Sequence, residues 1–418
     1  MNFLAFRQFH RVRCHPSGCA GRSHPRARGS VINAQDEPIP FAQPDVGDAE
    51  ADAVRDAIRA GWLTTGRLTA EFEREFAESV GAAHAVAVTS ATAALHLALE
   101  AAGIGPGDEV LVPTWTFTAT AEVVRYLGGE PVLVDVDPTT LALDLKLAAG
   151  QVTGRTRAVI PVHFGGLPVD PVALADFARD HGVAVVEDAA HAFPAGTDGR
   201  LVGAGDSLAT AFSFYSTKTM TTGEGGMLTT NDDRVAARAR VMRLHGIDRD
   251  VLDRYTRAGA RWQYDVIAPG YKYNLTDIAS ALGRVQLSRA PEMRRRREAI
   301  ALRYTEAFAD LPLELPAPAP ADVTHAWHLY TVRLLDAPVD RDAFVESLAR
   351  AGVSTSVHFI PLHLMTYWRE RLDLRPEDFP VATDSFPRAV SLPIFSAQTD
   401  VQVERVISAV RDALAAGA

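Results

Sequence analysis

Cysteine is nearly absent from this chain of 418 residues, which contains only Cys14 and Cys19. Both lie in the first 35 residues, and the rest of the chain, from Asp36 on, has none. A disulfide framework needs paired cysteines, and a thiolate metal site needs several of them. The sequence therefore excludes both for the body of the protein, and we expect no metal site there.

Long apolar runs and an excess of positive charge are missing too. No uninterrupted apolar stretch is long enough to cross a bilayer as a helix. The net charge of −10 argues against nucleic acid as a partner. None of the strands predicted below is followed by a Gly-x-Gly-x-x-Gly loop, which argues against a nicotinamide-binding fold. What remains is a globular chain that is long enough for two domains.

The first 35 residues differ from the rest in charge, since they contain six arginines and no acidic residue. Three interpretations stay open: an organelle-targeting peptide, a disordered arm, or sequence that precedes the true start. The Ala- and Arg-rich body is typical of a GC-rich bacterial genome. We therefore favour a disordered or spurious leader and expect a cytoplasmic protein.

From residue 85 on, short apolar runs alternate with helical patterns, after helical spacing between residues 45 and 80. Apolar strands that alternate with helices predict an α/β fold, with a mostly parallel sheet covered on both faces. The predicted strands are residues 85–89, 109–113, 131–136, 158–164, 183–187, 209–214 and 227–230, and the predicted helices among them are 91–102 and 172–181.

Ligands bind at the carboxyl ends of such strands, and polar residues follow two of them. Ser90, Ala91 and Thr92 open a helix whose free N–H groups offer a phosphate seat, although a simple helix cap by Ser90 gives the same pattern. Asp188 ends a buried strand, where it either caps the next helix or faces a protonated heterocycle nitrogen. His191 follows and is also compatible with a core position.

The stretch from Phe212 to Gly226 is the most informative part of the sequence. A single lysine, Lys218, lies among hydroxyl and glycine residues between two uncharged apolar runs. The packed turn that this pattern predicts would desolvate the amine, lower its pKa and leave it neutral. A neutral amine is what imine formation with an aldehyde requires.

Several other segments admit two interpretations. The glycine-bracketed turn at residues 61–66 either borders a pocket or only connects two helices. The aromatic residues at 115 and 117 either lie in the core or stack on a flat ring. Residues 240–275 are too long and aromatic for a structureless loop, which indicates a functional segment. A helix predicted at 278–302 carries the basic run 294–297, which we interpret as a solvated face.

The C-terminal part begins after a Pro-rich segment, residues 311–320, which is the clearest linker. Beyond it the pattern predicts a strand at 327–335, a helix at 341–351, a strand at 355–359 and a terminal helix at 401–415. We expect three regions: a leader at 1–35, a large domain at 36–290 and a small C-terminal α/β domain at 291–418.

From residue 41 to the C-terminus, an ordered set of segments resembles the DegT/DnrJ/EryC1/StrS family of sugar aminotransferases, which depend on pyridoxal phosphate (PLP). The segments are residues 61–66, 90–95, 106–110, 187–191, 212–226, 270–277 and 357–363. The resemblance implies the fold type I, or aspartate-aminotransferase-like, PLP-dependent transferase fold. That fold combines a mostly parallel seven-stranded sheet with a small C-terminal domain. The resemblance also implies a homodimer with shared active sites.

By this resemblance, Lys218 forms an imine with PLP, and Asp188 pairs with the pyridine nitrogen so that the ring can accept electrons. Phe117 or Trp115 would cover one face of the ring, and His191 would reach its phenolic oxygen. The phosphate would be held by Ala91, Thr92, Ser213 and, from the neighbouring subunit, Asn274. The substrate side would be lined by Thr65, His163, Tyr271, Lys272, His358 and His363.

The implied reaction is a ping-pong transfer of an amino group, with Lys218 as general base. The donor is an amino acid, glutamate above all, and the acceptor a nucleotide-linked ketosugar. A cyclitol ketone is the alternative acceptor, and an amino-acid acceptor would need an arginine clamp. Related dehydratases carry histidine in place of the lysine and desulfurases need a cysteine, so this sequence argues against both. A non-catalytic regulator would need a DNA-binding module, for which the leader is too short.

Overall fold

The structure is a computed structural model that describes residues 37–248 and 264–415. All the elements below lie in one compact unit, Pro38–Ala418. The expected leader, with both cysteines, lies outside the described residues. Within the described ranges no helix is long and apolar enough to cross a membrane, and no group of acidic, His or Cys side chains could hold a metal ion.

A seven-stranded sheet is the centre of the fold, and all seven predicted strands are present. Its order is β1-β9-β8-β5-β4-β2-β3, with β9 antiparallel to both neighbours and the other pairs parallel. This confirms the predicted fold class. The strands are β1 (His84–Val88), β2 (Glu109–Pro113), β3 (Glu130–Val134), β4 (Thr156–Val159), β5 (Ala184–Asp188), β8 (Ala209–Ser213) and β9 (Gly226–Thr230).

One strand prediction was too long. The continuous ladder of the run 158–164 ends at Val159, although Val162 still bridges to Asp188, and the chain then turns into a 3-10 segment, Phe164–Gly166. Gly165 and Gly166 both have positive φ there, at 64° and 99°. Glycine adopts this region without steric cost, so the run ends in a turn that its hydrophobicity does not reveal.

Alternate residues of the strands face two apolar layers. Val86 and Val88 pack with α3 (Ala91–Ala101), α4 (Ala119–Tyr126) and α7 (Asp233–Met242). Ala85 and Ala87 face the other way, toward α2 (Arg67–Val80). At the β2–β3 end that second layer consists of α5 (Leu145–Gln151) and α6 (Pro171–His181). Because successive side chains of a strand point to opposite faces, both faces of the sheet are apolar and both are covered by helices.

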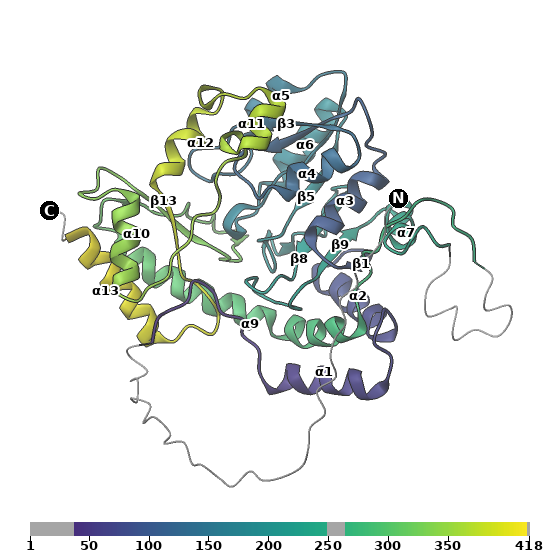
Figure 1. Ribbon diagram of the computed structural model, residues 1–418, viewed down its shortest axis with the longest axis horizontal. Helices are drawn as coiled ribbons and strands as arrows, with labels where there is room; N and C mark the ends of the chain where they lie inside the picture. The colour runs from purple at the N-terminus through teal and green to yellow at the C-terminus, as the bar shows by residue number, and fades with distance from the viewer. Residues whose placement is uncertain (1–36, 249–263, 416–418) are drawn as a thin grey trace, which may run out of the picture. The chain divides into compact units, whose positions relative to one another are not determined.

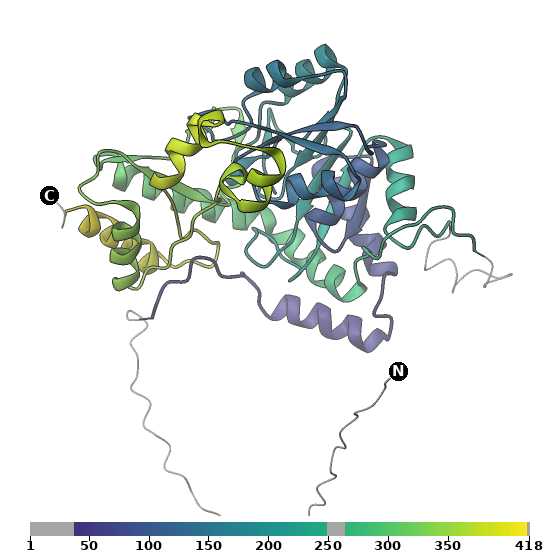
Figure 2. The ribbon, with the colours of Figure 1, turned by 45° about the horizontal axis from the view of Figure 1, so that its top comes forward.

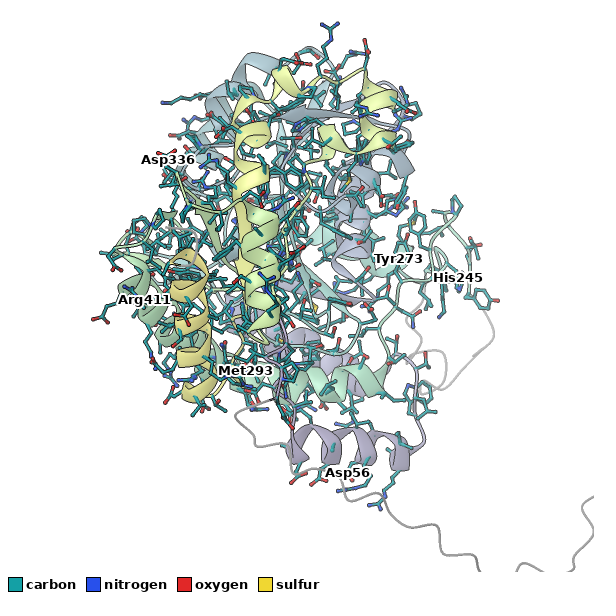
Figure 3. The ribbon with its side chains drawn as sticks, turned by 60° about the vertical axis from the view of Figure 1, so that its left-hand side comes forward. Asp56, His245, Tyr273, Met293, Asp336 and Arg411 are labelled. Atoms are coloured by element: carbon teal, nitrogen blue, oxygen red, sulfur yellow. The ribbon has the colours of Figure 1, made fainter. Side chains whose placement is uncertain are left out.

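The long helix α9 (Asp277–Phe308) connects the two ends of this unit (Figure 1). It packs against α1 (Asp48–Ala60) and α2 at its start and against α13 (Asp400–Ala415) near its end, as Figure 2 also shows. Met293, labelled in Figure 3, is a buried residue near its middle. The interpretation of residues 294–297 as a solvated face was wrong for Arg297, which is 2% exposed.

A second apolar core surrounds the C-terminal half of α9. It includes the antiparallel sheet β10 (Leu313–Glu314), β12 (Tyr330–Leu334) and β13 (Ala389–Leu392), with α10 (Arg341–Arg350) and α13. β10 therefore forms part of the segment that we interpreted as a linker. Two short helices, α11 (Thr366–Leu372) and α12 (Pro380–Ser385), return to the first core. The division at residues 36–290 and 291–418 stays a prediction, and α9 runs across it.

The strand predicted at residues 355–359 was wrong. Ser356 makes a single bridge to Ser391, and the chain then leaves the sheet. The strand that pairs with β12 is β13, whose residues Ala389–Leu392 are all buried. The predicted segment runs beside β13 without a ladder, and an alternating pattern alone does not distinguish the two arrangements.

Candidate active site

Register brings the end of β5 and the ends of three neighbouring strands to one edge of the sheet. Asp188, the last residue of β5, pairs with Ala211 of β8. Ser213, the last residue of β8, pairs with Gly226 of β9, which in turn pairs with Val88 of β1. The residues that follow β5, β8 and β1 therefore emerge side by side, where an α/β sheet binds its ligands.

Asp188 is a buried carboxylate, 6% exposed, at this edge. Its Oδ2 accepts a hydrogen bond from Thr120 Oγ1 (2.8 Å), and its Oδ1 accepts one from the Ala190 N–H (3.1 Å). Burial raises its pKa, although these bonds and the charges of Lys218 and His163 act in the opposite direction. No ion pair within the described ranges neutralises it. A buried acid without a cation is costly, so the site favours a positive group against Asp188.

Lys218 lies on the turn after β8, where its N–H donates to the carbonyl of Tyr215. Burial lowers the pKa of its amine to about 8, although the nearby charge of Asp188 raises it. The amine is desolvated, but the turn itself is only partly packed, since Tyr215 is 47% exposed and residues 216–218 are half-buried. An amine with this pKa is neutral in roughly a tenth of the molecules at pH 7, against fewer than about one in a thousand for an ordinary lysine, and the neutral form is the nucleophile for an aldehyde.

Three imidazoles lie around this amine. His328 Nε2 is 3.4 Å from Lys218 Nζ, and the ring of His191 lies 4.3 Å from that of His328. The charge of Lys218 also acts on His358, whose pKa burial lowers to about 4. Burial, and after it Lys218, holds the pKa of His191 and of His328 well below the usual value. All three rings are therefore neutral, so none of them adds a positive charge beside the amine.

The start of α3 offers donors at the same edge. Ser90 caps the helix, since its Oγ accepts from the Ala93 N–H (3.1 Å). The N–H groups of Ala91 and Thr92, in the first turn, have no acceptor within the helix and remain available to an anion. Gly226 keeps this end close to the sheet, because a Cβ there would lie 2.4 Å from the carbonyl carbon of Ser90. Ser90 can therefore cap the helix while the N–H groups of Ala91 and Thr92 bind a phosphate.

These residues fit a PLP group. A buried carboxylate suits a protonated ring nitrogen, and the free N–H groups of α3 with the hydroxyl of Ser213 suit a phosphate. The Nδ1 atoms of His191 and His328 are buried and have no partner in the described part of the chain. Buried polar atoms are seldom left without a partner in a complete site, and His191 Nδ1 could meet a polar atom of the cofactor ring.

The aromatic residues divide into core and surface. Trp115 is fully buried in the core, and its Nε1 donates to the carbonyl of His358 (2.9 Å). It is therefore unavailable to stack on a cofactor, which corrects one of the two alternatives. Phe117 is 58% exposed and lies 5.8 Å from the ring of Phe359. Phe117 stays the proposed stacking residue.

Two histidines predicted on the substrate side are enclosed by protein, so these predictions were wrong. His163 is 0% exposed, accepts from the Val169 N–H at Nδ1 and donates from Nε2 to Glu187 (2.9 Å). His363 is also 0% exposed, with Nδ1 2.8 Å from Thr114 Oγ1 and Nε2 3.0 Å from Thr383 Oγ1. With both nitrogens of each ring bonded to protein, neither ring can bind a substrate.

Thr65, Lys272 and Asn274 form a chain of hydrogen bonds beside the end of β1. Lys272 Nζ donates to Asn274 Oδ1 (2.6 Å), and Asn274 Nδ2 donates to Thr65 Oγ1 (2.7 Å). Asn274 also bridges to Val88. Tyr271, next to Lys272, stacks on Tyr273 at 5.1 Å. Their predicted roles in binding the phosphate and the substrate remain proposals.

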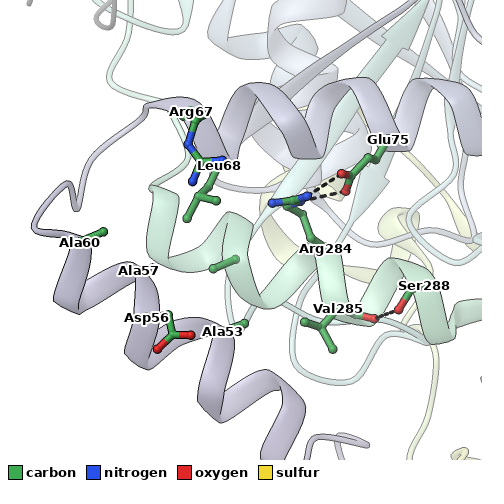
Figure 4. A pocket seen from close by; sticks show the side chains of 11 residues that line it. Ala53, Asp56, Ala57, Ala60, Arg67, Leu68, Glu75, Arg284, Val285 and Ser288 are labelled. Carbon is green, nitrogen blue, oxygen red and sulfur yellow. Dashed lines mark hydrogen bonds and ion pairs between the residues drawn. The ribbon is translucent and has the colours of Figure 1, made fainter.

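A separate groove of about 470 Å³ lies between α1, α2 and α9 (Figure 4). Arg284 crosses it and pairs with Glu75 (2.7 Å), so its charge is neutralised. None of the residues discussed above lines this groove. Its location gives no reason to connect it with the chemistry at Lys218.

Sequence reasoning missed Thr120, His328 and Arg297. Thr120 ends the Thr-rich stretch after β2, and the polar residues after a buried strand were a usable signal for it. His328 lies in a predicted strand, 110 residues from its partner Lys218, so no local pattern reveals it. Arg297 was hidden in a run of four arginines, although its spacing from Met293 and Ile300 places it on the apolar face of α9.

The lowered pKa of Lys218 predicts a stability effect in cofactor-free protein. The folded value of about 8 lies below the unfolded value of 10.5. The unfolded chain therefore binds more protons between these pH values, and stability rises with pH there. The cost of burying this amine is complete below pH 8. We expect Lys218→Met to stabilise the protein at pH 7 by on the order of 2 kcal/mol, and less toward pH 10.

Urea unfolding of both proteins at pH 7 and pH 9.5 measures this difference. Lys146→Met is the matched control, because Lys146 is exposed on α5 and should change stability by under about 0.5 kcal/mol. A gain that is absent at pH 7, or that does not shrink with rising pH, would show that the amine is not held in a desolvating site.

Comparison with known proteins agrees with this geometry. The model of the DegT/DnrJ/EryC1/StrS aminotransferase family matches residues 44–411. The spore coat polysaccharide biosynthesis protein SpsC of Bacillus subtilis is 44% identical over 386 residues, which cover 91% of this chain and 98% of SpsC.

Solved structures agree as well. The putative sugar aminotransferase Spr1654 from Streptococcus pneumoniae, in its PLP-form, superposes with a TM-score of 0.84 and 32% identity over 91% of this chain and 100% of that one. The aminotransferase TlmJ from Streptoalloteichus hindustanus superposes with a TM-score of 0.82 and 38% identity over 90% and 99%. This chain therefore belongs to the DegT/DnrJ/EryC1/StrS aminotransferase family, and it is a PLP-dependent sugar aminotransferase.

Proposed function

We propose that this enzyme moves an amino group from L-glutamate to a nucleotide-linked ketosugar and so makes an aminosugar. The observation that carries the proposal is the desolvated amine of Lys218, whose pKa is lowered to about 8, near the buried carboxylate of Asp188. The relatives support the class of acceptor. SpsC is named for polysaccharide biosynthesis and Spr1654 as a putative sugar aminotransferase, the latter solved in both PLP- and PMP-forms. We also propose a cytoplasmic location.

The proposed roles follow from the chemistry of each residue. Lys218 would hold the cofactor and, once released, carry a proton between the donor carbon and the cofactor. Asp188 would keep the ring nitrogen protonated, with Thr120 fixing its carboxylate. When bound, PLP supplies the electron sink that makes the carbon beside the nitrogen acidic. Phe117 would cover the ring and His191 would reach its phenolic oxygen. Ala91, Thr92 and Ser213 would bind its phosphate.

An amino-acid acceptor is less well supported. It would need an arginine that grips a second carboxylate. Arg297 is the arginine whose charge acts on Lys218, and its Nη1 points at backbone carbonyl oxygens. A cyclitol ketone, which like a ketosugar has no carboxylate, remains the second candidate acceptor.

We propose a homodimer in which Asn274 reaches the phosphate at the neighbouring subunit's site, with Thr65 and Lys272 in support. Hydrogen bonds hold these three side chains together beside the end of β1. Tyr271 and His358 stay candidates for substrate contact.

The first prediction is an assay of both half-reactions. Adding L-glutamate to the holoenzyme should remove the near-visible absorbance of the lysine-bound cofactor, because the amino group moves to the cofactor. A panel of nucleotide-linked ketosugars and free cyclitol ketones, analysed by mass spectrometry, should then give an amino product from a nucleotide-linked sugar. Product from cyclitols alone would select the second candidate, and no spectral change with glutamate or any other amino acid would contradict the proposed transfer.

The second prediction concerns the shared site. Lys218→Ala and Asn274→Ala homodimers should each be nearly inactive. If Asn274 serves the neighbouring site, mixing the two after mild dissociation gives heterodimers with one intact site. Activity should then recover to about a quarter of the wild-type value at equal mixing. No recovery, although native mass spectrometry detects heterodimers, would place Asn274 in its own chain's site, and an active Asn274→Ala homodimer would place it outside both sites.

A further inference from the structure

Arg297 is the most deeply buried arginine of the basic run on α9, and it makes no ion pair with a carboxylate in the described residues. Its Nη1 donates to three backbone carbonyls, those of Ile394 (2.8 Å), Trp327 (3.3 Å) and His328 (3.4 Å). Its Nε is buried without a partner in the described part of the chain. A guanidinium stays charged even when buried, so a positive charge is fixed inside the protein.

This arginine is linked to the site through one residue. The carbonyl of His328 accepts from Arg297, and the side chain of the same residue places Nε2 3.4 Å from Lys218 Nζ. His328 is 6% exposed and neutral, because burial and nearby positive charges lower its pKa. A neutral imidazole nitrogen can accept a hydrogen bond from an amine. The chain from Arg297 through His328 to Lys218 therefore connects α9 with the turn after β8.

The other groups around Lys218 do not supply a positive charge. Asp188, on β5, favours the charged amine, and burial opposes it. His191 and His358, from the segments after β5 and before β13, are neutral. Arg297 is thus the positive charge that acts on this amine.

We propose that Arg297 and His328 form a positioning pair for Lys218. The guanidinium fixes the backbone of His328 and disfavours a proton on the amine, while the imidazole holds the amine in place. Lys218 would then be oriented, and neutral in a larger fraction of molecules, each time it is released from the cofactor. This inference rests on the role proposed for Lys218.

The test measures how fast cofactor-free, full-length protein binds PLP at Lys218, as a function of pH. Stopped-flow absorbance follows imine formation, and Lys218→Ala provides the blank. The rate rises with the neutral fraction of the amine, so the midpoint of the profile reports its pKa, expected at about 8 in the wild type. Absence of a Lys218-dependent signal in the wild type would overturn both the role of Lys218 and this inference.

Arg297→Gln removes the charge but keeps an amide that can donate to a carbonyl. We expect its midpoint to rise by about one pH unit, so that binding below the midpoint slows about tenfold. Arg297→Lys keeps the charge and should keep the midpoint. Arg296→Gln is the matched control. It removes the charge of the neighbouring arginine, which pairs with Asp400 at 2.9 Å, and it should leave the midpoint of the profile unchanged.

A midpoint in Arg297→Gln equal to that of the wild type would overturn the inference, as would an equal shift in Arg297→Lys. Circular dichroism and thermal melts check that each variant is folded. His328→Leu tests the second half without altering a charge. Its plateau rate at high pH should fall about tenfold, because the neutral amine loses its orientation. An unchanged plateau in folded His328→Leu would refute the positioning role.

Discussion

The protonation state of one buried amine is the constraint on which the site depends. Lys218 must be neutral to attack an aldehyde, yet it lies near Asp188, whose charge favours the protonated form. Burial acts against Asp188 and is the larger effect. The neutral imidazoles around the amine add no charge. The same burial that makes Lys218 reactive leaves Asp188 in need of a cation, and a protonated pyridine ring would supply it.

The sheet delivers these groups to one place through its register. The pairs Asp188–Ala211, Ser213–Gly226 and Gly226–Val88 align four strand ends. Gly226 permits this because no side chain separates β9 from the first turn of α3. The acid, the amine and the anion-binding N–H groups come from segments far apart in sequence. Their common position depends on backbone pairing more than on any local motif.

Local patterns were enough to predict much of this. Apolar strands followed by polar residues identified the sheet, Asp188 and the start of α3, and the uncharged surroundings of Lys218 indicated its desolvation. The enclosed histidines could not be found this way, because His363 depends on Thr114, which lies 249 residues away. Arg297 is different. Its charge suggested a solvent-exposed side chain. Its spacing from Ala290, Met293 and Ile300 instead places it on the apolar face of α9, and this helical spacing predicts its burial correctly.

The central claim, that Lys218 is the residue that carries the cofactor, can be tested directly because the chain has only three lysines, Lys146, Lys218 and Lys272. Borohydride reduction of the PLP-loaded enzyme fixes the cofactor to whichever amine holds it, and peptide mass spectrometry then identifies that lysine. We predict that the label lies on the peptide containing Lys218. A label on Lys146 or Lys272, with Lys218 unmodified, would contradict the account.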